Sequence, residues 1–496
     1  MNSLESKVVT ATKWSALTEI ASKLISPIST MILARLLTPE AYGAVATTTI
    51  IISFAELFTD AGFQKYIIQH DFTDDDDRDK SINVAFWSNL VMSLIIWGII
   101  IALRHPIARL VGSPGLETAI AVACAAIPIA AFSSIQSAIY KRNLNFRVPF
   151  IVRMIGLGLT FFVTIPLAFW LRSYWALIIS SLIQGTTSAG MLTFYSDWKP
   201  KIYYSFKRLK EMLGFCSTII INSILVWINT TIVLFLVSSY FDNYTLGIYK
   251  TSISKATGLL SIISTSIIPI LLPTFSKLQN DASKLKNTML DLQKVVSVIL
   301  LPLSFTIFLY SEIITRIFLG SQWNEAAQLI GIWTLVSSFS LLINHFCGKA
   351  LTAIGKPQLS TIISILYLSI LIPSVIITIK YGFKTVFYTH ALTNIWLIIL
   401  HLIAIYIYIK LSPFKIFSNI MPELIGCGIM IGLSDSLSAI CNTTILQIVS
   451  MLICLAAYFV FLFSLRSERL IIKKIWKHAT NKLLKKESLP TYKSAI

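Results

Sequence analysis

The chain contains 496 residues, of which 55% are hydrophobic and 13% are charged, and its mean hydropathy is +0.75. Soluble domains carry about 25% charged residues, so this composition excludes an ordinary soluble protein and predicts an integral membrane protein. The formal net charge of +18 is explained by orientation in the membrane and by contact with anionic lipid. Because basic patches interleaved with aromatic residues are absent, we expect no nucleic-acid partner.

Apolar runs recur from one end of the chain to the other. A helix that crosses a bilayer needs about 20 apolar residues, and charged, Pro and Gly breaks divide the runs into fourteen segments of that size. The predicted transmembrane helices are 12–34, 41–64, 81–103, 117–140, 149–171, 173–195, 213–238, 245–272, 293–318, 326–352, 358–380, 385–409, 419–438 and 444–465. We therefore predict an all-α integral membrane protein with fourteen transmembrane helices.

A weak repeat, recognised by position, groups these helices. The polar break Leu37–Gly43 before the second helix corresponds in placement to Phe241–Gly247 before the eighth. The predicted parts are an N-lobe with helices 1–6 (1–195), a cytoplasmic linker (196–212), a C-lobe with helices 7–12 (213–410), a helix pair 13–14 (411–465) and a basic cytoplasmic tail (466–496). In transporters built from repeated halves, the substrate site lies near the midplane between the repeats.

The distribution of positive charge predicts the orientation. Most of the 41 Lys and Arg residues fall on one side when the N-terminus is placed in the cytoplasm, as short basic loops require. Both termini are then cytoplasmic, and the basic tail is expected to lie on the inner leaflet. The first helix is interrupted by Glu19 and Lys23, so we expect it to remain as a helix and not to act as a signal peptide.

Metal and nucleotide chemistry are not indicated. The six cysteines are scattered and show no Cys-x-x-Cys spacing, so neither a zinc site nor a disulfide framework is expected. The acidic run Asp74–Asp77 lacks the alternating ligands and the glycine of a calcium loop. No Walker loop is present. We expect no metal and no bound cofactor.

Polar side chains form a stripe along one face of each of three predicted helices. Residues at steps of three and four fall on one face of a helix. The stripes comprise Ser15, Glu19, Ser22, Ser26 and Ser29 in the first helix, with Lys23 beside them, Thr49, Ser53, Glu56 and Asp60 in the second, and Lys250, Ser254, Thr257, Ser261 and Ser264 in the eighth. Lys255 lies off the last stripe, about 140° around the helix.

The charged members of these stripes need a polar environment. A charge at the bilayer centre costs about 2.5–3.5 kcal/mol on insertion scales, and four of them facing lipid would cost on the order of 10 kcal/mol. One explanation is that Glu19 and Lys23, four residues apart, neutralise each other and that Lys250 reaches an interface by snorkelling. For Lys23, Lys255, Glu56 and Asp60 we favour a water-filled cavity between the lobes, although the seryl stripes alone would indicate close helix packing.

Five motifs carry a resemblance to a known family. They are Lys13-Trp-Ser-Ala16, Ala34-Arg-Leu-Leu-Thr-Pro-Glu-Ala-Tyr-Gly43, Asp60-Ala-Gly-Phe63 followed by Ile67-Ile-Gln69, Leu272-Pro-Thr-Phe-Ser-Lys-Leu-Gln-Asn-Asp281 and Phe318-Leu-Gly-Ser-Gln-Trp323. From the first helix through the tenth, the chain resembles the bacterial Wzx-type O-antigen and exopolysaccharide flippases. These flippases belong to the multidrug/oligosaccharidyl-lipid/polysaccharide exporter superfamily.

The resemblance implies a fold and a function. The fold is a V-shaped pair of six-helix lobes in the bacterial inner membrane, with helices 1, 2, 7 and 8 lining a central cavity and helices 13 and 14 along the lipid tail of the substrate. The implied activity is translocation, not catalysis, of undecaprenyl-pyrophosphate-linked oligosaccharide units for O-antigen, capsule or exopolysaccharide. Lys23, Lys250 and Lys255 would then receive the pyrophosphate, because mobile ammonium groups bind an anion that must be released again.

The energy source and the partners follow from the same function. Moving about two negative charges outward across roughly 100 mV releases about 4.6 kcal/mol, so the membrane potential alone could drive export. Glu19, Glu56 and Asp60 are alternatively candidates for proton or sodium coupling, or counter-charges for the lysines. The expected partners are the lipid-linked oligosaccharide and anionic lipid, with a polysaccharide polymerase and glycosyltransferases as further candidates.

Two other classes of protein are alternatives to the flippase. A cation-coupled multidrug exporter of the same superfamily would share the twelve-helix core and could bind its cation at Glu56 and Asp60. It would not need three lysines at midplane. A membrane polymerase or ligase would need a large outer loop with acid–base residues, and the longest predicted outer loop, about Arg104 to Glu117, is too short and holds no histidine beyond His105.

Overall fold

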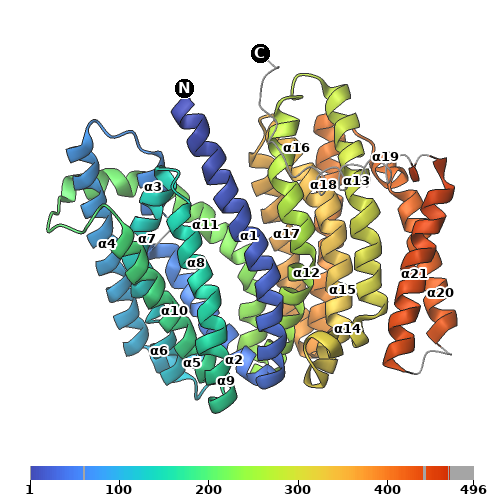
Figure 1. Cartoon of the computed structure of the whole chain (residues 1–496), viewed down its shortest axis with the longest axis horizontal. Helices are drawn as coiled ribbons and strands as arrows, with labels where there is room; N and C mark the ends of the chain where they lie inside the picture. The colour runs from blue at the N-terminus through green and yellow to red at the C-terminus, as the bar shows by residue number, and fades with distance from the viewer. Residues whose placement is uncertain (1, 60–61, 439–442, 467, 470–496) are drawn as a thin grey trace. The chain divides into compact units, whose positions relative to one another are not determined.

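The computed structural model describes residues 2–59, 62–438, 443–466 and 468–469. In that part of the chain the regular structure is helical and no strand occurs (Figure 1). Twelve helices are long and apolar enough to cross a membrane, and two bent helix pairs raise the number to fourteen when each pair is one span. The predicted all-α membrane fold is confirmed, and the fourteen predicted spans agree with the upper of these two numbers. Asp60, Cys441 and the tail beyond Arg469 lie outside the described residues.

The chain divides into two compact units. Unit 1 comprises Met1–Thr251, Phe318–Glu325 and Ile372–Thr389, and unit 2 comprises Ser252–Ile317, Ala326–Leu371 and His390–Ile496. This division follows three-dimensional contacts, whereas the predicted lobes follow the sequence repeat, and the lobes remain a prediction.

Unit 1 is built from the first eleven α-helices and the start of the twelfth. These are α1 (Asn2–Leu36), α2 (Pro39–Thr59), α3 (Phe63–Gln69), α4 (Asp75–Ala102), α5 (Arg104–Leu110), α6 (Glu117–Ala123), α7 (Ala126–Arg142), α8 (Arg147–Leu159), α9 (Ile165–Leu171), α10 (Tyr174–Tyr195), α11 (Phe206–Tyr240) and α12 (Asn243–Ser276). Within the unit, α7 packs against α3, α4 and α10, α1 packs against α8 and α9, and α2 packs against α11.

Unit 2 contains the rest of α12 and most of the later helices. These are α13 (Ala282–Leu309), α14 (Ser311–Phe318), α15 (Asn324–Ser340), α16 (Phe346–Ala353), α17 (Gln358–Thr378), α18 (Phe383–Ile409), α19 (Pro413–Asn419), α20 (Met421–Ser438) and α21 (Thr444–Ser464), with the ends of α14, α15, α17 and α18 reaching into unit 1. A large apolar core joins α13, α16, α20 and α21.

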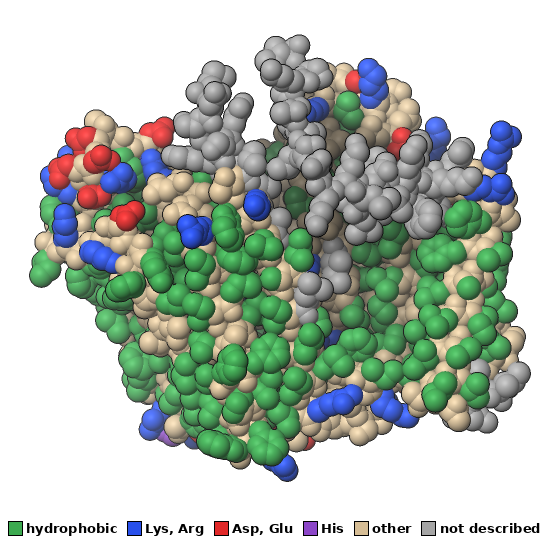
Figure 2. All heavy atoms as spheres, viewed as in Figure 1, with side chains coloured by type: hydrophobic (Ala, Val, Ile, Leu, Met, Phe, Trp, Pro, Cys, Tyr) green, Lys and Arg blue, Asp and Glu red, His purple; other side chains and the backbone are tan. Residues whose placement is uncertain are grey.

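Unit 1 exposes large apolar side chains, as contact with the lipid of a membrane requires. Large apolar residues such as Phe162 (83% exposed) and Trp170 (81% exposed) lie on its surface, where a soluble protein would avoid them. In Figure 2, hydrophobic side chains cover the middle of its visible face, and acidic and basic side chains gather at the end where α4 begins. There, Arg78 and Lys80 form ion pairs with Asp75 and Asp76.

Several helix boundaries differ from the sequence prediction, for local reasons. The described part of the second helix runs to Thr59, where residues 60 and 61 lie outside the described residues, and a short helix, α3, runs from Phe63 to Gln69 beyond the predicted end at residue 64. The ninth helix begins at Ala282 instead of residue 293 because the Asp281 carboxylate accepts a hydrogen bond from the Lys284 N–H, 3.0 Å away, and caps its first turn.

Helix α12 is bent by 63° between its segments Asn243–Ser261 and Ile263–Ser276. Hydroxyl groups around the bend donate to carbonyl groups of their own helix: Ser261 Oγ to Gly258 at 2.7 Å and Thr265 Oγ1 to Ser261 at 2.7 Å. Hydrogen bonds of this kind compete with the helical ladder and bend helices, and Pro269 removes a further N–H from it.

Candidate functional site

The predicted lysines of α12 occupy its first straight segment. Lys250 and Lys255 are both half-buried, and they lie about 7.5 Å apart along the axis and about 140° apart around it. Among the described residues, neither ammonium group has a hydrogen-bond or ion-pair partner. Burial removes part of the water around each of them, and no protein charge compensates. Ionisable groups inside membrane spans are rare, and many of them line substrate or ion pathways.

The charged residues of α1 and α2 are more accessible. On α1, Lys23 is half-buried and Glu19 is exposed, and on α2, Glu56 is exposed. The structure therefore places Glu56 on an accessible face of its helix, while Asp60, its predicted companion, lies outside the described residues.

The hydroxyl groups of the predicted stripes donate to their own helices. Thr257 Oγ1 donates to the Ile253 carbonyl oxygen at 2.8 Å, and Thr49 Oγ1 donates to Val45 at 2.7 Å. Both side chains are exposed. Each hydroxyl oxygen keeps lone pairs that can accept hydrogen bonds, so these faces offer weak acceptors to a passing polar ligand.

Trp227 of α11 lies against the polar face of α2. Its indole Nε1 donates to Ser53 Oγ over 3.0 Å, and its ring packs on Phe54 with 5.1 Å between centroids. Trp227 and Phe54 also line a pocket within unit 1 that has a volume of 680 Å³ and apolar walls from α2, α4, α5 and α11. An aliphatic chain is the chemistry that such walls accept.

A close helix crossing joins the beginnings of α2 and α12. A Cβ atom on Gly43 would overlap the Asn243 backbone, and one on Gly247 would overlap the carbonyl group of Pro39. Glycine is therefore required at both positions for the helices to come this close. We call this contact, formed by Pro39, Gly43, Asn243 and Gly247, the α2–α12 seam.

Buried polar groups extend the seam. The Asn243 Oδ1 atom accepts a hydrogen bond from Ser113 Oγ at 3.0 Å and lies 3.5 Å from Thr47 Oγ1, and Thr47 and Ser113 are themselves 3.3 Å apart. Both hydroxyl residues are buried. The Asn243 side chain thus links two helices, α2 and α12, and the 111–113 loop at one point, which favours a single arrangement of the three.

The segment Phe318–Glu325 covers the connection between α1 and α2. Gln322 Nε2 donates to the carbonyl oxygens of Ala34 and of Leu37, the latter at 2.8 Å, and Trp323 Nε1 donates to Ala34 at 2.9 Å. The fully buried Trp323 ring packs edge-on against Tyr42, 5.2 Å between centroids. Two of the quoted family motifs, 34–43 and 318–323, are therefore in direct contact.

Sequence reasoning found part of this site. The glycines at 43 and 247 and the polar breaks before them are visible in the sequence, and the structure brings the two breaks together. Thr47, Ser113 and Asn243 were missed, because single small polar residues near helix ends give no periodic signal. Among the residues that the structure describes, no group of three or more His, Cys, Asp or Glu side chains is arranged to hold a metal ion.

Comparison with known proteins identifies relatives. Residues 32–328 match the model of a family described as polysaccharide biosynthesis protein. The chain is 22% identical to the succinoglycan biosynthesis transport protein ExoT of Rhizobium meliloti over 65% of its own length, and it spans 64% of that relative. It is 20% identical to the lipopolysaccharide biosynthesis protein WzxC of Escherichia coli over 76% of each chain.

The fold is also present among solved structures. The lipid II flippase MurJ, in an inward closed conformation, aligns with a TM-score of 0.69 at 15% identity, over 90% of this chain and 97% of that one. At this identity the likeness concerns the fold alone.

Proposed function

Because this chain belongs to the polysaccharide biosynthesis protein family, we propose that it is a flippase for undecaprenyl-pyrophosphate-linked oligosaccharide units. It moves them across the bacterial inner membrane by alternating access, for O-antigen, capsule or exopolysaccharide synthesis. The observation that carries the proposal is the pair of ammonium groups on α12, Lys250 and Lys255, which lack a protein partner among the described residues.

A pyrophosphate group accounts for the presence of two lysines without a protein partner inside a membrane span. Its two negative charges lose hydration on entering the bilayer, and ammonium groups replace the lost water with charge-assisted hydrogen bonds. Two lysines on different faces of α12 can act in succession, each as a mobile point charge that releases the anion. The hydroxyl groups on α2 and α12 accept hydrogen bonds from sugar hydroxyls too weakly to retain them.

The α2–α12 seam supports alternating access. Under the orientation predicted from the Lys and Arg residues, the beginnings of α2 and α12 lie at the outer face of the membrane. The seam then closes the outer side in the described state, and the substrate enters from the cytoplasm. Transport requires the seam to separate, and its short polar contacts allow this more readily than a large apolar interface would.

The test is flipping by the purified protein in liposomes. A fluorescent undecaprenyl-pyrophosphate oligosaccharide is placed in the membrane, and its exposure to an external quencher is followed over time. We expect Lys255→Ala and Lys250→Ala each to slow flipping by at least tenfold, and Lys255→Arg to keep part of the rate. The matched control is Lys284→Ala, which removes a lysine that is 74% exposed in the first helical turn of α13.

Two results would reject the proposal. If the double variant Lys250→Ala/Lys255→Ala flips at the rate of the unmodified protein, the lysines do not receive the anion. If the unmodified protein does not flip the lipid but expels cationic dyes against a proton or sodium gradient, it is the multidrug exporter that we considered as the alternative.

A further inference from the structure

The apolar pocket of unit 1, which Trp227 and Phe54 line, is elongated along its helices. It has a volume of 680 Å³ and takes no part in the proposed binding of the pyrophosphate. Its lining extends over residues 50–58 of α2, 92–100 of α4 and 227–235 of α11, which is about 12 Å along the axis of each helix. The pocket therefore has the direction that a hydrocarbon chain takes in a bilayer.

Helix α5 closes one end of the pocket. Leu110 of α5 and the next residue, Val111, line that end. Ser239 Oγ, in the last turn of α11, donates to the Leu110 carbonyl oxygen over 2.9 Å, and a Cβ atom on Gly112 would lie 2.2 Å from the Ser238 carbonyl oxygen. Close contacts with the end of α11 thus hold α5 in place.

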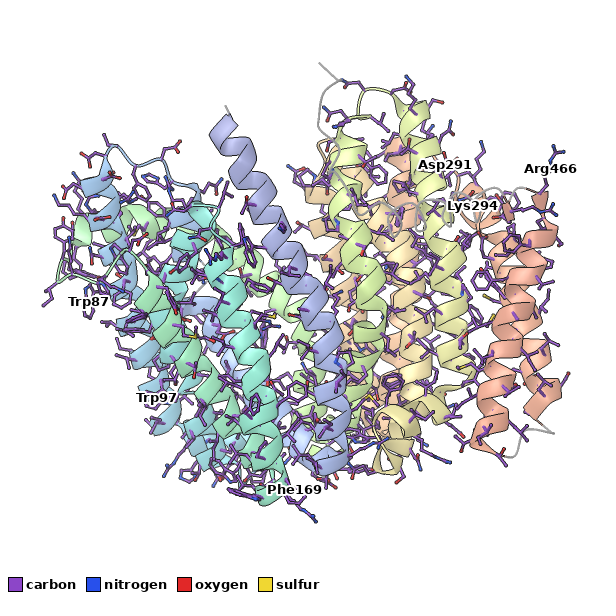
Figure 3. All side chains as sticks on the ribbon, in the orientation of Figure 1. Trp87, Trp97, Phe169, Asp291, Lys294 and Arg466 are labelled. Carbon is purple, nitrogen blue, oxygen red and sulfur yellow. The ribbon has the colours of Figure 1, made fainter. Side chains whose placement is uncertain are left out.

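The wall formed by α4 is also held by the protein. Trp97, labelled on α4 in Figure 3, follows the lining residue Ile96. Its indole Nε1 donates to the carbonyl oxygen of Ala121 on α6, 2.9 Å away. The pocket is therefore formed by contacts within unit 1, as ligand sites usually are before the ligand binds.

The walls favour a hydrocarbon ligand over water. Among the described residues that line the pocket, Trp227 carries the one side-chain N–H, and Ser53 Oγ accepts it at 3.0 Å. A water molecule needs polar partners that these walls do not offer, whereas a hydrocarbon chain gains dispersion contacts on all sides. Phe54 (48% exposed), Ile99 (50%) and Leu110 (64%) line the pocket at the protein surface, so a chain can enter from the membrane.

A positive charge lies beside the entrance. Helix α5 follows the span Asp75–Ala102 and precedes the span Glu117–Arg142, so it lies at a membrane face in either orientation of the chain. Arg109 is exposed on α5 directly before Leu110. A guanidinium group at this depth binds the phosphate of a lipid headgroup through paired hydrogen bonds.

We propose that this pocket is a binding site for an anionic phospholipid. Arg109 holds the phosphate, one acyl chain passes over Leu110, and the end of that chain occupies the pocket. The size of the pocket supports a phospholipid over a polyprenyl lipid, because an undecaprenyl chain is several times longer than the lined depth and would remain largely outside.

The first test identifies the lipid. Full-length protein is extracted in a mild detergent, phosphatidylglycerol is added, and native mass spectrometry reports the mass and number of retained lipids. We expect one retained phosphatidylglycerol, and at least a several-fold loss of retention in Ile99→Trp, which narrows the entrance. The matched control is Ile95→Trp, one turn away on α4, where an isoleucine that is 57% exposed does not line the pocket.

Three outcomes of this test would overturn the proposal. Equal retention in Ile99→Trp and Ile95→Trp would mean that the lipid lies elsewhere on the protein surface. A polyprenyl lipid that is retained instead, and lost in Ile99→Trp, would assign the pocket to that lipid. The absence of any retained lipid in the unmodified protein would show that the pocket does not bind one.

The second test locates the chain and the headgroup. Phosphatidylglycerol with bromine near the end of one acyl chain quenches nearby tryptophan fluorescence, and the difference between unmodified protein and Trp227→Phe isolates the signal of Trp227. We expect this signal to saturate at one lipid per protein. Arg109→Gln should raise the half-saturating concentration several-fold, and phosphatidylcholine with the same chains should require a similar excess.

The matched control for the headgroup is Arg172→Gln, which removes another exposed arginine of unit 1. It should leave the half-saturating concentration unchanged. If both arginine variants give the same curve, Arg109 does not hold the phosphate, and if Trp227 contributes no quenching, the chain is not in the pocket. Neither test depends on the flippase function.

Discussion

Single glycines decide whether the α2–α12 seam can form. We predict that Gly43→Ala and Gly247→Ala each destabilise the described state, because the added methyl group would overlap backbone atoms that cannot rotate away. Overpacking of this kind costs about 1–3 kcal/mol. The measurement is the Tm of the purified protein in detergent, which should fall by several degrees.

A matched control is available within α4. A Cβ atom on Gly98 would meet nothing within 4 Å, so Gly98→Ala should leave the Tm unchanged or raise it, as expected for alanine in a helix. If Gly43→Ala and Gly98→Ala have the same Tm, the seam does not hold the two helices together.

Some residues of the site could be predicted from the sequence, and others could not. Gly43 and Gly247 are conspicuous because each follows a polar break, and their contact agrees with the repeat. Asn243 gave no signal, because an asparagine at the start of a helix is ordinary. Its partners Thr47 and Ser113 are distant in the sequence and meet it only in the folded chain.

At the scale of elements, helix existence was predictable and helix boundaries were less so. Long apolar runs define the spans because the bilayer demands them. The short helix α14 was absorbed into the predicted span 293–318, and most of α3 lay outside every predicted span, since seven or eight residues carry too little periodicity to be recognised. The start of α13 depends on the Asp281 cap. The first turns of this helix are polar, so the hydropathy of the chain does not reveal them.

The capped start of α13 should respond to pH. Hydrogen bonds from Lys284 and Ser283 hold the pKa of the Asp281 carboxyl below its usual value. A carboxyl with a lowered folded pKa stabilises the fold above its unfolded pKa, and this contribution is lost as pH falls through the folded pKa. We predict that amide protection of residues 283–286 drops in acid, when measured by hydrogen exchange corrected for intrinsic rates.

Asp281→Asn separates the charge from the cap. Asparagine still accepts the hydrogen bond from Lys284 but has no proton to gain, so protection in this variant should be constant across the same acidic range. Asp281→Ala should lack protection throughout. A pH-dependent Asp281→Asn variant would show that another group controls this turn.

At the scale of the whole molecule, the orientation of the chain in the membrane decides in which direction the membrane potential acts on a charged substrate. We predict that a cysteine in place of Arg109, which is exposed, reacts with a membrane-impermeant maleimide on intact spheroplasts, whereas one in place of Lys284 reacts only after permeabilisation. The five described native cysteines are buried, so replacing Cys441 with serine provides a clean background. The reverse labelling pattern would mean that the topology is inverted and that the α2–α12 seam lies at the cytoplasmic face of the membrane.

The orientation in turn predicts how membrane potential acts on transport. Under the proposed function, and with the termini inside, export would move about two negative charges outward, and an inside-negative potential of roughly 100 mV would favour the product by about 4.6 kcal/mol. In liposomes with a potassium diffusion potential, inside-negative polarity should speed the outward movement of the lipid-linked oligosaccharide by right-side-out protein, and inside-positive polarity should slow it. The same lipid with an uncharged headgroup should respond to neither polarity. Rates that ignore polarity for the charged lipid would mean that an accompanying cation cancels the charge, and Glu56, exposed on α2, is then the residue to replace with glutamine.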